Sequence, residues 1–101
     1  MAFSAPTTLL AVLDDARALL ERPGNDFTWS SFADADAAVG EIDELAAAVR
    51  AGGVPFALGV LFAPTGPIQE VAISSGWGQE FLILADRFDA ARAAADHTSS
   101  D

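Results

Sequence analysis

Residues 54–74 contain two short apolar runs separated by prolines and a glycine, and this segment limits the possible fold more than any other part of the chain. The first run, at 54–62, reads Val-Pro-Phe-Ala-Leu-Gly-Val-Leu-Phe, and the second, at 68–74, reads Ile-Gln-Glu-Val-Ala-Ile-Ser. Between them the chain reads Ala-Pro-Thr-Gly-Pro, which is typical of a turn. Two runs rich in β-branched and aromatic residues around such a turn predict an antiparallel β-hairpin.

The side chains also predict the register of this hairpin. A four-residue loop from Pro64 to Pro67 places Val60 opposite Val71, and it gathers the large apolar residues on one face because strand side chains alternate. A shift by one residue would instead place Glu70 beside Val60. The predicted buried face consists of Phe56, Leu58, Val60, Phe62, Val71 and Ile73. The opposite face keeps Leu61 and Ile68 as its large apolar residues.

The chain on either side of the hairpin has helical spacing. The first helix is capped by Thr7 or Thr8 and ends at the turn residues 23–26. The second begins after Ser31 as N-cap and ends at Gly52-Gly53, and the third begins near Trp77. Their predicted core positions are Leu9, Leu13, Ala16 and Leu20; Ala35, Val39, Ile42, Leu45 or Ala46, and Val49; and Phe81, Leu84, Ala85, Phe88, Ala91 and Ala95. We expect Ile42, Val60 and Phe88 each to be buried, and Asp86, Asp89 and Arg92 to face solvent on the third helix.

The predicted fold is therefore a single α+β domain over residues 1–101, of order α-α-β-β-α, with flexible ends at 1–7 and 98–101. A two-stranded hairpin is marginally stable by itself, so its sheet needs further cover. Residues 27–29, Phe-Thr-Trp, form either a third strand or a loop. Alternatively, a second copy of the chain completes the sheet.

The charge balance excludes several classes of function. Fifteen acidic residues and five arginines give a net charge of −10, and the chain has no lysine and no cysteine. Lysine Schiff-base chemistry, phosphate-loop lysines, disulfides and thiolate metal sites are thereby excluded. Nucleic acid is a poor partner for such a surface, whereas a basic protein would be attracted to it.

The sequence carries no targeting signal that we recognise. No apolar run approaches the length of a membrane span, and the N-terminus lacks the basic region of a signal peptide. We therefore expect a cytoplasmic protein without membrane contact. The abundant alanine and the use of arginine instead of lysine are typical of a GC-rich bacterial genome.

No motif in the chain predicts a cofactor, a metal site or catalysis. Gly76-Trp77-Gly78 resembles an anion-binding turn, but capping and tight turning explain its glycines. Residues 34–45 lack the glycine and the terminal acid of a calcium loop. The single histidine, His97, complements a helix C-terminus, and it is too isolated to serve a hydrolase triad.

Two groups of residues are candidates for a functional surface. The first is a polar cluster at the junction of the hairpin and the third helix: Gln69, Glu70, Glu80 and Arg87. The second is a candidate interface: Leu61, Ile68, Glu70, Ala72 and Trp77. Trp29 and Trp77 either seal the core or anchor a partner.

We expect a non-enzymatic interaction protein that forms a homodimer or binds a basic partner protein, as an immunity protein, antitoxin or inhibitor does. The alternative is a small-ligand-binding or regulatory domain with a pocket between the hairpin and the helices. A pocket lined by convergent polar groups favours the alternative.

Overall fold

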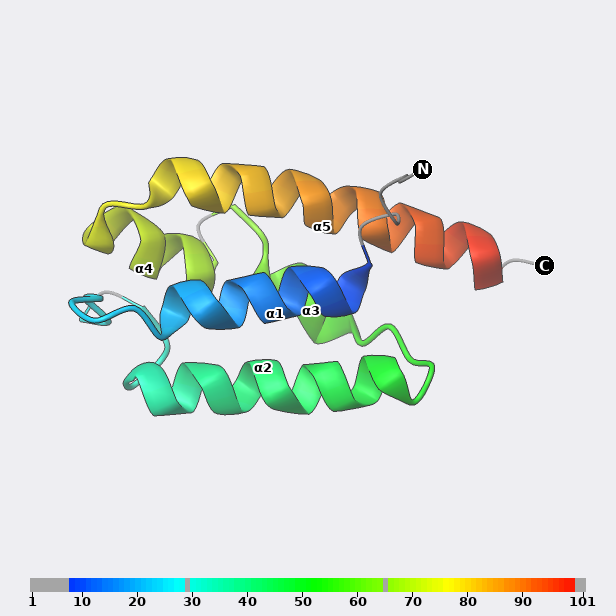
Figure 1. The fold of residues 1–101 in the computed structure, drawn as a ribbon, viewed down its shortest axis with the longest axis horizontal. Helices are drawn as coiled ribbons and strands as arrows, with labels where there is room; N and C mark the ends of the chain where they lie inside the picture. Colours follow the sequence, from blue (N-terminus) through cyan, green and yellow to red (C-terminus); the bar gives the residue numbers. More distant parts are fainter. Residues whose placement is uncertain (1–7, 29, 65, 100–101) are drawn as a thin grey trace, which may run out of the picture.

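The computed structural model describes residues 8–28, 30–64 and 66–99, and the side chains of the last helix as far as residue 94. Within these ranges the chain forms five α-helices (Figure 1). They are α1 (Leu9–Leu20), α2 (Ala35–Arg50), α3 (Phe56–Leu61), α4 (Pro67–Ser75) and α5 (Gly78–Ser99).

The predicted α+β fold with its β-hairpin is wrong, because the described residues contain no strand and the two apolar runs form α3 and α4. Both runs also fit a helical period. In α3 and the residue that follows it, Leu58, Leu61 and Phe62 are buried, and in α4 Ile68, Val71 and Ala72 are buried. Both sets have the spacing i, i+3, i+4 of one helix face. A short apolar run can fit either the helical period or the alternation of a strand, and in this structure both runs follow the helical period.

Two prolines and a glycine that we interpreted as turn residues or strand starts instead stand at helix termini. Pro55 has extended dihedral angles and is the N-cap of α3, while Pro67 is the first residue of α4. Proline is favoured there because its missing N–H has no partner in the first helical turn. Gly76 ends α4 with a φ of +87°, a left-handed conformation that glycine adopts at low cost.

The change of period alters half of the predicted buried face. Leu58, Phe62 and Val71 are buried as predicted, but the other three residues are not. Val60, which we expected to be buried, is 51% exposed, and Phe56 and Ile73 are exposed as well. Leu61 and Ile68, expected on the open face of the hairpin, are buried. Ile42 and Phe88, which we expected to be buried as well as Val60, are confirmed as buried.

The first two helices begin at side-chain caps. The Thr8 hydroxyl accepts a hydrogen bond from the backbone N–H of Ala11 at 3.1 Å, as predicted. The N-cap of α2 is Asp34 instead of the expected Ser31, and its carboxylate accepts from the N–H of Ala37 at 2.8 Å. An aspartate at this position also favours the positive end of the helix dipole.

In Figure 1, α1 lies between α2 on one side and α5 on the other, and α4 runs beside the beginning of α5. Arg17 joins α1 to α2 through a 2.9 Å bond from its Nε to Asp43. This hydrogen bond and the neighbouring carboxylates raise the pKa of Arg17. Two further ion pairs of 2.7 Å join this region to α5: Asp15 with Arg87, and Arg22 with Glu80.

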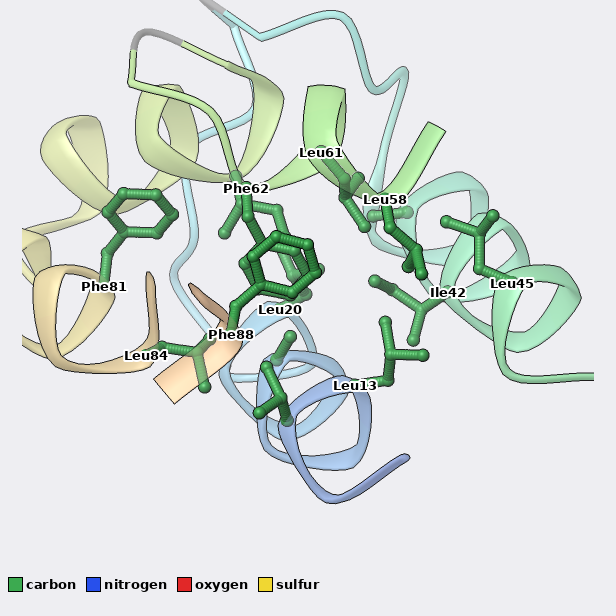
Figure 2. Close-up of a cluster of buried hydrophobic side chains, with 14 of the residues drawn as sticks. Leu13, Leu20, Ile42, Leu45, Leu58, Leu61, Phe62, Phe81, Leu84 and Phe88 are labelled. Atoms are coloured by element: carbon green, nitrogen blue, oxygen red, sulfur yellow. The ribbon is translucent and has the colours of Figure 1, made fainter. Parts of the chain in front are cut away.

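The core contains side chains from all five helices (Figure 2). At its centre the rings of Phe62 and Phe88 stack with their centroids 4.4 Å apart and their planes 13° apart. Such an aromatic pair contributes about 0.5–1.5 kcal/mol beyond its area burial. No polar or charged side chain is buried in the part of the chain that the structure describes.

Some of the predicted features lie partly or wholly outside the described residues. Phe27 and Thr28 do not form a strand, and Trp29 lies outside the described residues. The expected flexible ends 1–7 and 100–101 also lie outside them, whereas residues 98–99 continue α5. None of the helices in the described ranges combines the length and the apolar character needed to cross a membrane.

Candidate binding groove

A groove of about 590 Å³ lies between the end of α3, the segment that leads to α4, and α5. We call it the α3–α5 groove. It occupies the place that the sequence assigned to a possible pocket between the supposed hairpin and the last helix. Its walls are formed by Gly59, Phe62, Ala63, Pro64, Gln69, Phe81, Leu82, Ala85, Asp86, Phe88, Asp89 and Arg92.

Three phenylalanines make the groove apolar. Phe62 and Phe88 contribute their stacked rings, and Phe81 lies about two helical turns before Phe88 on α5. Figure 2 shows the stacked pair at the centre of the core cluster and Phe81 to its left. All three side chains are buried, at 2–4% exposure, so they contribute only small areas of ring to the groove floor, and Leu82 at 50% exposure adds a larger apolar area.

One edge of the groove is acidic. Leu82, Asp86 and Asp89 follow one another on α5 at i, i+4 and i+7, which places them along one side of the helix. Leu82 is 50% exposed, and both carboxylates are exposed to solvent. Neither carboxylate forms an ion pair with any described residue. We call Asp86 and Asp89 the acidic rim.

Arg92 crosses from α5 toward α3 at Gly59. A Cβ atom added at Gly59 would lie only 2.7 Å from the Nη1 atom of Arg92, so the absence of a side chain there makes room for the guanidinium. The Cζ atom of Arg92 also lies 6.0 Å from the ring centroid of Phe88, at the outer limit of a cation–π contact. Arg92 has no acidic partner among the described residues.

The predicted polar cluster is only partly assembled. Glu80 and Arg87 share a side of α5 as expected, and they line a shallow hollow of about 310 Å³ against α1. Each is already paired, Glu80 with Arg22 and Arg87 with Asp15. Gln69 instead lines the α3–α5 groove, and Glu70 lies in the first turn of α4.

Most residues of the predicted interface lie in the core. Leu61, Ile68, Ala72 and Trp77 are buried, and Glu70 is half-buried. The exposed large apolar residues of the described chain are different ones, namely Val54, Phe56, Val60, Ile73, Leu82 and Ile83.

Trp77 has a structural role in the 76–78 turn, whose sequence resembles an anion-binding turn. Its Nε1–H donates a 2.8 Å hydrogen bond to the Oδ1 atom of Asn25. The neighbouring Gly76 ends α4 and Gly78 begins α5, in agreement with the capping explanation. His97 belongs to α5, but its side chain lies outside the described part.

Sequence reasoning placed Asp86 and Asp89 correctly on the wet side of the last helix, yet it did not connect them to a binding groove. The missing information was the position of α3, because a hairpin leaves no helix end beside Phe62. The helical repeat of Leu82, Asp86 and Asp89 beside the buried positions of Phe81 and Phe88 was the available signal.

The described residues contain no group of three or more histidine, aspartate or glutamate side chains arranged to hold a metal ion. Comparison of the chain with protein-family models, with curated proteins and with solved structures finds no match.

Proposed function

We propose that this protein is a non-enzymatic interaction protein that binds a basic, partly apolar segment of a partner protein in the α3–α5 groove. The observation that carries the proposal is the combination of an apolar groove with an acidic rim that pairs with no basic side chain among the described residues. Apolar side chains of the partner pack on Leu82 and Ala85 and on the accessible edges of the buried phenylalanines, while its basic side chains approach Asp86 and Asp89. An inhibitory role toward a basic protein, as in immunity proteins and antitoxins, fits this chemistry.

The distribution of the arginines supports a basic partner. Arg17, Arg22 and Arg87 are each engaged in ion pairs within the chain. The net charge of −10 therefore leaves acidic groups whose positive partner is not supplied internally. Such a surface accelerates the encounter with a basic protein and repels acidic ones.

A small amphipathic acid is the second candidate, and Arg92 is the observation that favours it. A guanidinium without an acidic partner among the described side chains, at the end of an apolar groove, can bind a carboxylate whose hydrocarbon part rests on the apolar lining. The acidic rim opposes this ligand, since Asp86 and Asp89 repel an anion. The first candidate uses both carboxylates and therefore ranks above it.

A pair of designed helical peptides tests the proposal. One peptide carries leucines along one side and lysines along the other, and its counterpart has glutamate in place of every lysine. Fluorescence anisotropy of the labelled peptides is measured with the unmodified protein at low and at moderate salt. The lysine peptide is expected to bind and to weaken as salt rises, while the glutamate peptide does not bind.

Charge-matched variants locate the site. Asp86→Asn with Asp89→Asn removes two charges at the groove, and Asp36→Asn with Glu44→Gln removes two from exposed positions of α2. The groove variant should bind about fivefold more weakly, because each exposed charge pair is worth about 0.2–1 kcal/mol. Equal losses in both variants would show non-specific attraction and refute the groove. Binding of octanoate that depends on Arg92 would favour the second candidate.

A further inference from the structure

Arg92 is the single basic residue among the described residues that line the α3–α5 groove. Asp89 precedes it by three residues on α5, a spacing at which opposite charges on one helix can pair. No ion pair joins the two side chains. The guanidinium lies instead against Gly59 of α3, where an added Cβ atom would approach its Nη1 atom to 2.7 Å. The groove therefore holds a positive charge that forms no ion pair with the neighbouring acidic rim.

The acidic rim and Arg92 are displaced from one another along α5. Asp86, Asp89 and Arg92 follow at steps of three residues, so Arg92 lies roughly 4.5 Å beyond Asp89 and roughly 9 Å beyond Asp86 along the helix axis. Around the axis, Arg92 lies about 60° from Asp89 and about 40° from Phe88, between the rim and the buried ring. A segment that follows α5 in the groove therefore meets two carboxylates at one end and a guanidinium at the other.

This arrangement acts differently on a lone anion and on a segment that carries both charges. A small acid at Arg92 is repelled by Asp86 and Asp89, which pair with no described basic side chain. Basic side chains of a bound segment neutralise this rim, and an acidic side chain of the same segment can then approach Arg92. The planar fork of N–H donors of an arginine fits a carboxylate, and the half-buried Arg92 is partly shielded from water.

We propose that the partner segment carries an acidic side chain within about two helical turns of its basic side chains, and that Arg92 binds this carboxylate. The inference rests on the proposed function, because it concerns a further feature of the same segment. A uniformly basic segment would place a cation against Arg92, and like charges repel each other. Arg92 thus selects a segment with a basic part and an acidic part over a uniformly basic one.

Three kinds of helical peptide with the same leucine stripe test this selection. The reference peptide has lysines in its central turns and glutamines at the other polar positions. The end-glutamate peptide replaces a terminal glutamine and is made in two versions, one for each end. The central-glutamate peptide replaces a glutamine between the lysines. All are acetylated and amidated, so that no terminal charge takes part.

The two kinds of glutamate peptide have equal net charge, so a general attraction to a protein of net charge −10 would weaken both equally relative to the reference. One version of the end-glutamate peptide is nevertheless expected to bind about threefold more tightly than the reference, because its carboxylate pairs with Arg92. The central-glutamate peptide should bind more weakly, because its carboxylate faces the acidic rim. Fluorescence anisotropy with the unmodified protein measures all of them, so this comparison depends on no variant.

Arg92→Gln locates the effect, and Arg50→Gln is the matched control. Both remove one positive charge, and Arg50 is exposed at the end of α2, outside the groove lining. The gain from the end glutamate should disappear in Arg92→Gln and persist in Arg50→Gln. Circular dichroism verifies that both variants keep their helix content.

The failure of this proposal differs from the failure of the proposed function. If the reference peptide binds and neither end glutamate tightens it, the role of Arg92 is wrong and the basic partner of the groove stands. A gain that persists in Arg92→Gln overturns that role as well. If none of the peptides binds, the proposed function is refuted, and this inference is refuted with it.

Discussion

The indole N–H of Trp77 donates a 2.8 Å hydrogen bond to the side-chain oxygen of Asn25, and this bond joins the α4–α5 turn to the end of α1. The amide nitrogen of Asn25 donates in turn to the carbonyl oxygens of Leu19 at 2.8 Å and Leu20 at 3.1 Å. One side chain therefore satisfies the last carbonyls of a helix and the N–H of a buried tryptophan.

Loss of the Asn25 side chain should destabilise the fold more than is usual for a half-buried residue. We expect Asn25→Ala to lower the free energy of unfolding by about 1–3 kcal/mol, because it removes the partner of the Trp77 N–H and the Asn25 bonds to the carbonyls of Leu19 and Leu20. Urea denaturation of Asn25→Ala, Trp77→Phe and the double variant measures the coupling. An interaction energy near zero would show that the bond contributes nothing to stability.

Truncation of two phenylalanines should distinguish the core from the exposed side of α3. Phe88 is 3% exposed and stacks on Phe62, so Phe88→Ala should cost about 3–5 kcal/mol through lost transfer energy and a cavity. Phe56→Ala, at 80% exposure, should change the stability of the monomer by no more than about 0.5 kcal/mol. Thermal or urea unfolding at low protein concentration measures both. Similar losses from the two variants would contradict the helical assignment of α3.

Two glycine substitutions should have opposite effects. A Cβ atom at Gly66 would lie 2.7 Å from the carbonyl oxygen of Val60 and 2.9 Å from that of Ala63, and backbone atoms cannot easily move away. Gly66→Ala should therefore destabilise the fold by about 1–3 kcal/mol. Gly40 lies within α2 with open space around it, so Gly40→Ala should stabilise by about 0.5–1 kcal/mol. Urea midpoints that shift in the same direction would contradict this contrast.

Asp26, in the loop after α1, has a lowered pKa. Hydrogen bonds from the Thr28 side chain and from its backbone N–H lower the pKa of Asp26. Because the pKa is lowered in the folded state, the associated stability is present above the ordinary carboxyl pKa of 3.8 and is lost as the pH falls through the folded-state value.

Thr28→Val removes the hydroxyl and keeps the backbone bond. The pKa of Asp26 should then rise part of the way toward its ordinary value, as measured by the NMR titration of its carboxyl carbon. An unchanged titration would assign the whole shift to the backbone N–H.

The sequence predicted the longer helices well and the central segment poorly, and the difference has a physical origin. α1, α2 and α5 each repeat their apolar residues over three or more turns, so the helical period cannot be mistaken for an alternating one. The α3 run is too short for that distinction. Phe56, Leu58, Val60 and Phe62 alternate as a strand does, while Leu58, Leu61 and Phe62 repeat as a helix does. Tertiary packing decides between them: the folded chain buries Leu61 together with Leu58 and Phe62, and it leaves Phe56 and Val60 exposed.

The candidate site depended on the same ambiguity. Phe81, Phe88 and the acidic rim are readable from the spacing of α5, and the sequence placed all of them on the correct sides of that helix. The opposite wall of the groove was not predictable, because Gly59 and Ala63 line it only when α3 is a helix. The six residues of α3 were interpreted as a strand, and this error prevented the prediction of the groove, although its wall on α5 was predicted correctly.

The central position of α1 has a consequence for the synthesis of the chain. Its apolar side is shared between α2, which follows directly, and α5, which is translated last; Asp15 and its partner Arg87 are 72 residues apart. A nascent chain that ends before α5 can pair α1 with α2, but it leaves Leu20 and its neighbours without their cover from the last helix. Closure of so long a segment carries an entropic cost that only the finished core repays. The native domain therefore forms only after α5 has left the ribosome, and shorter nascent chains should remain sensitive to protease.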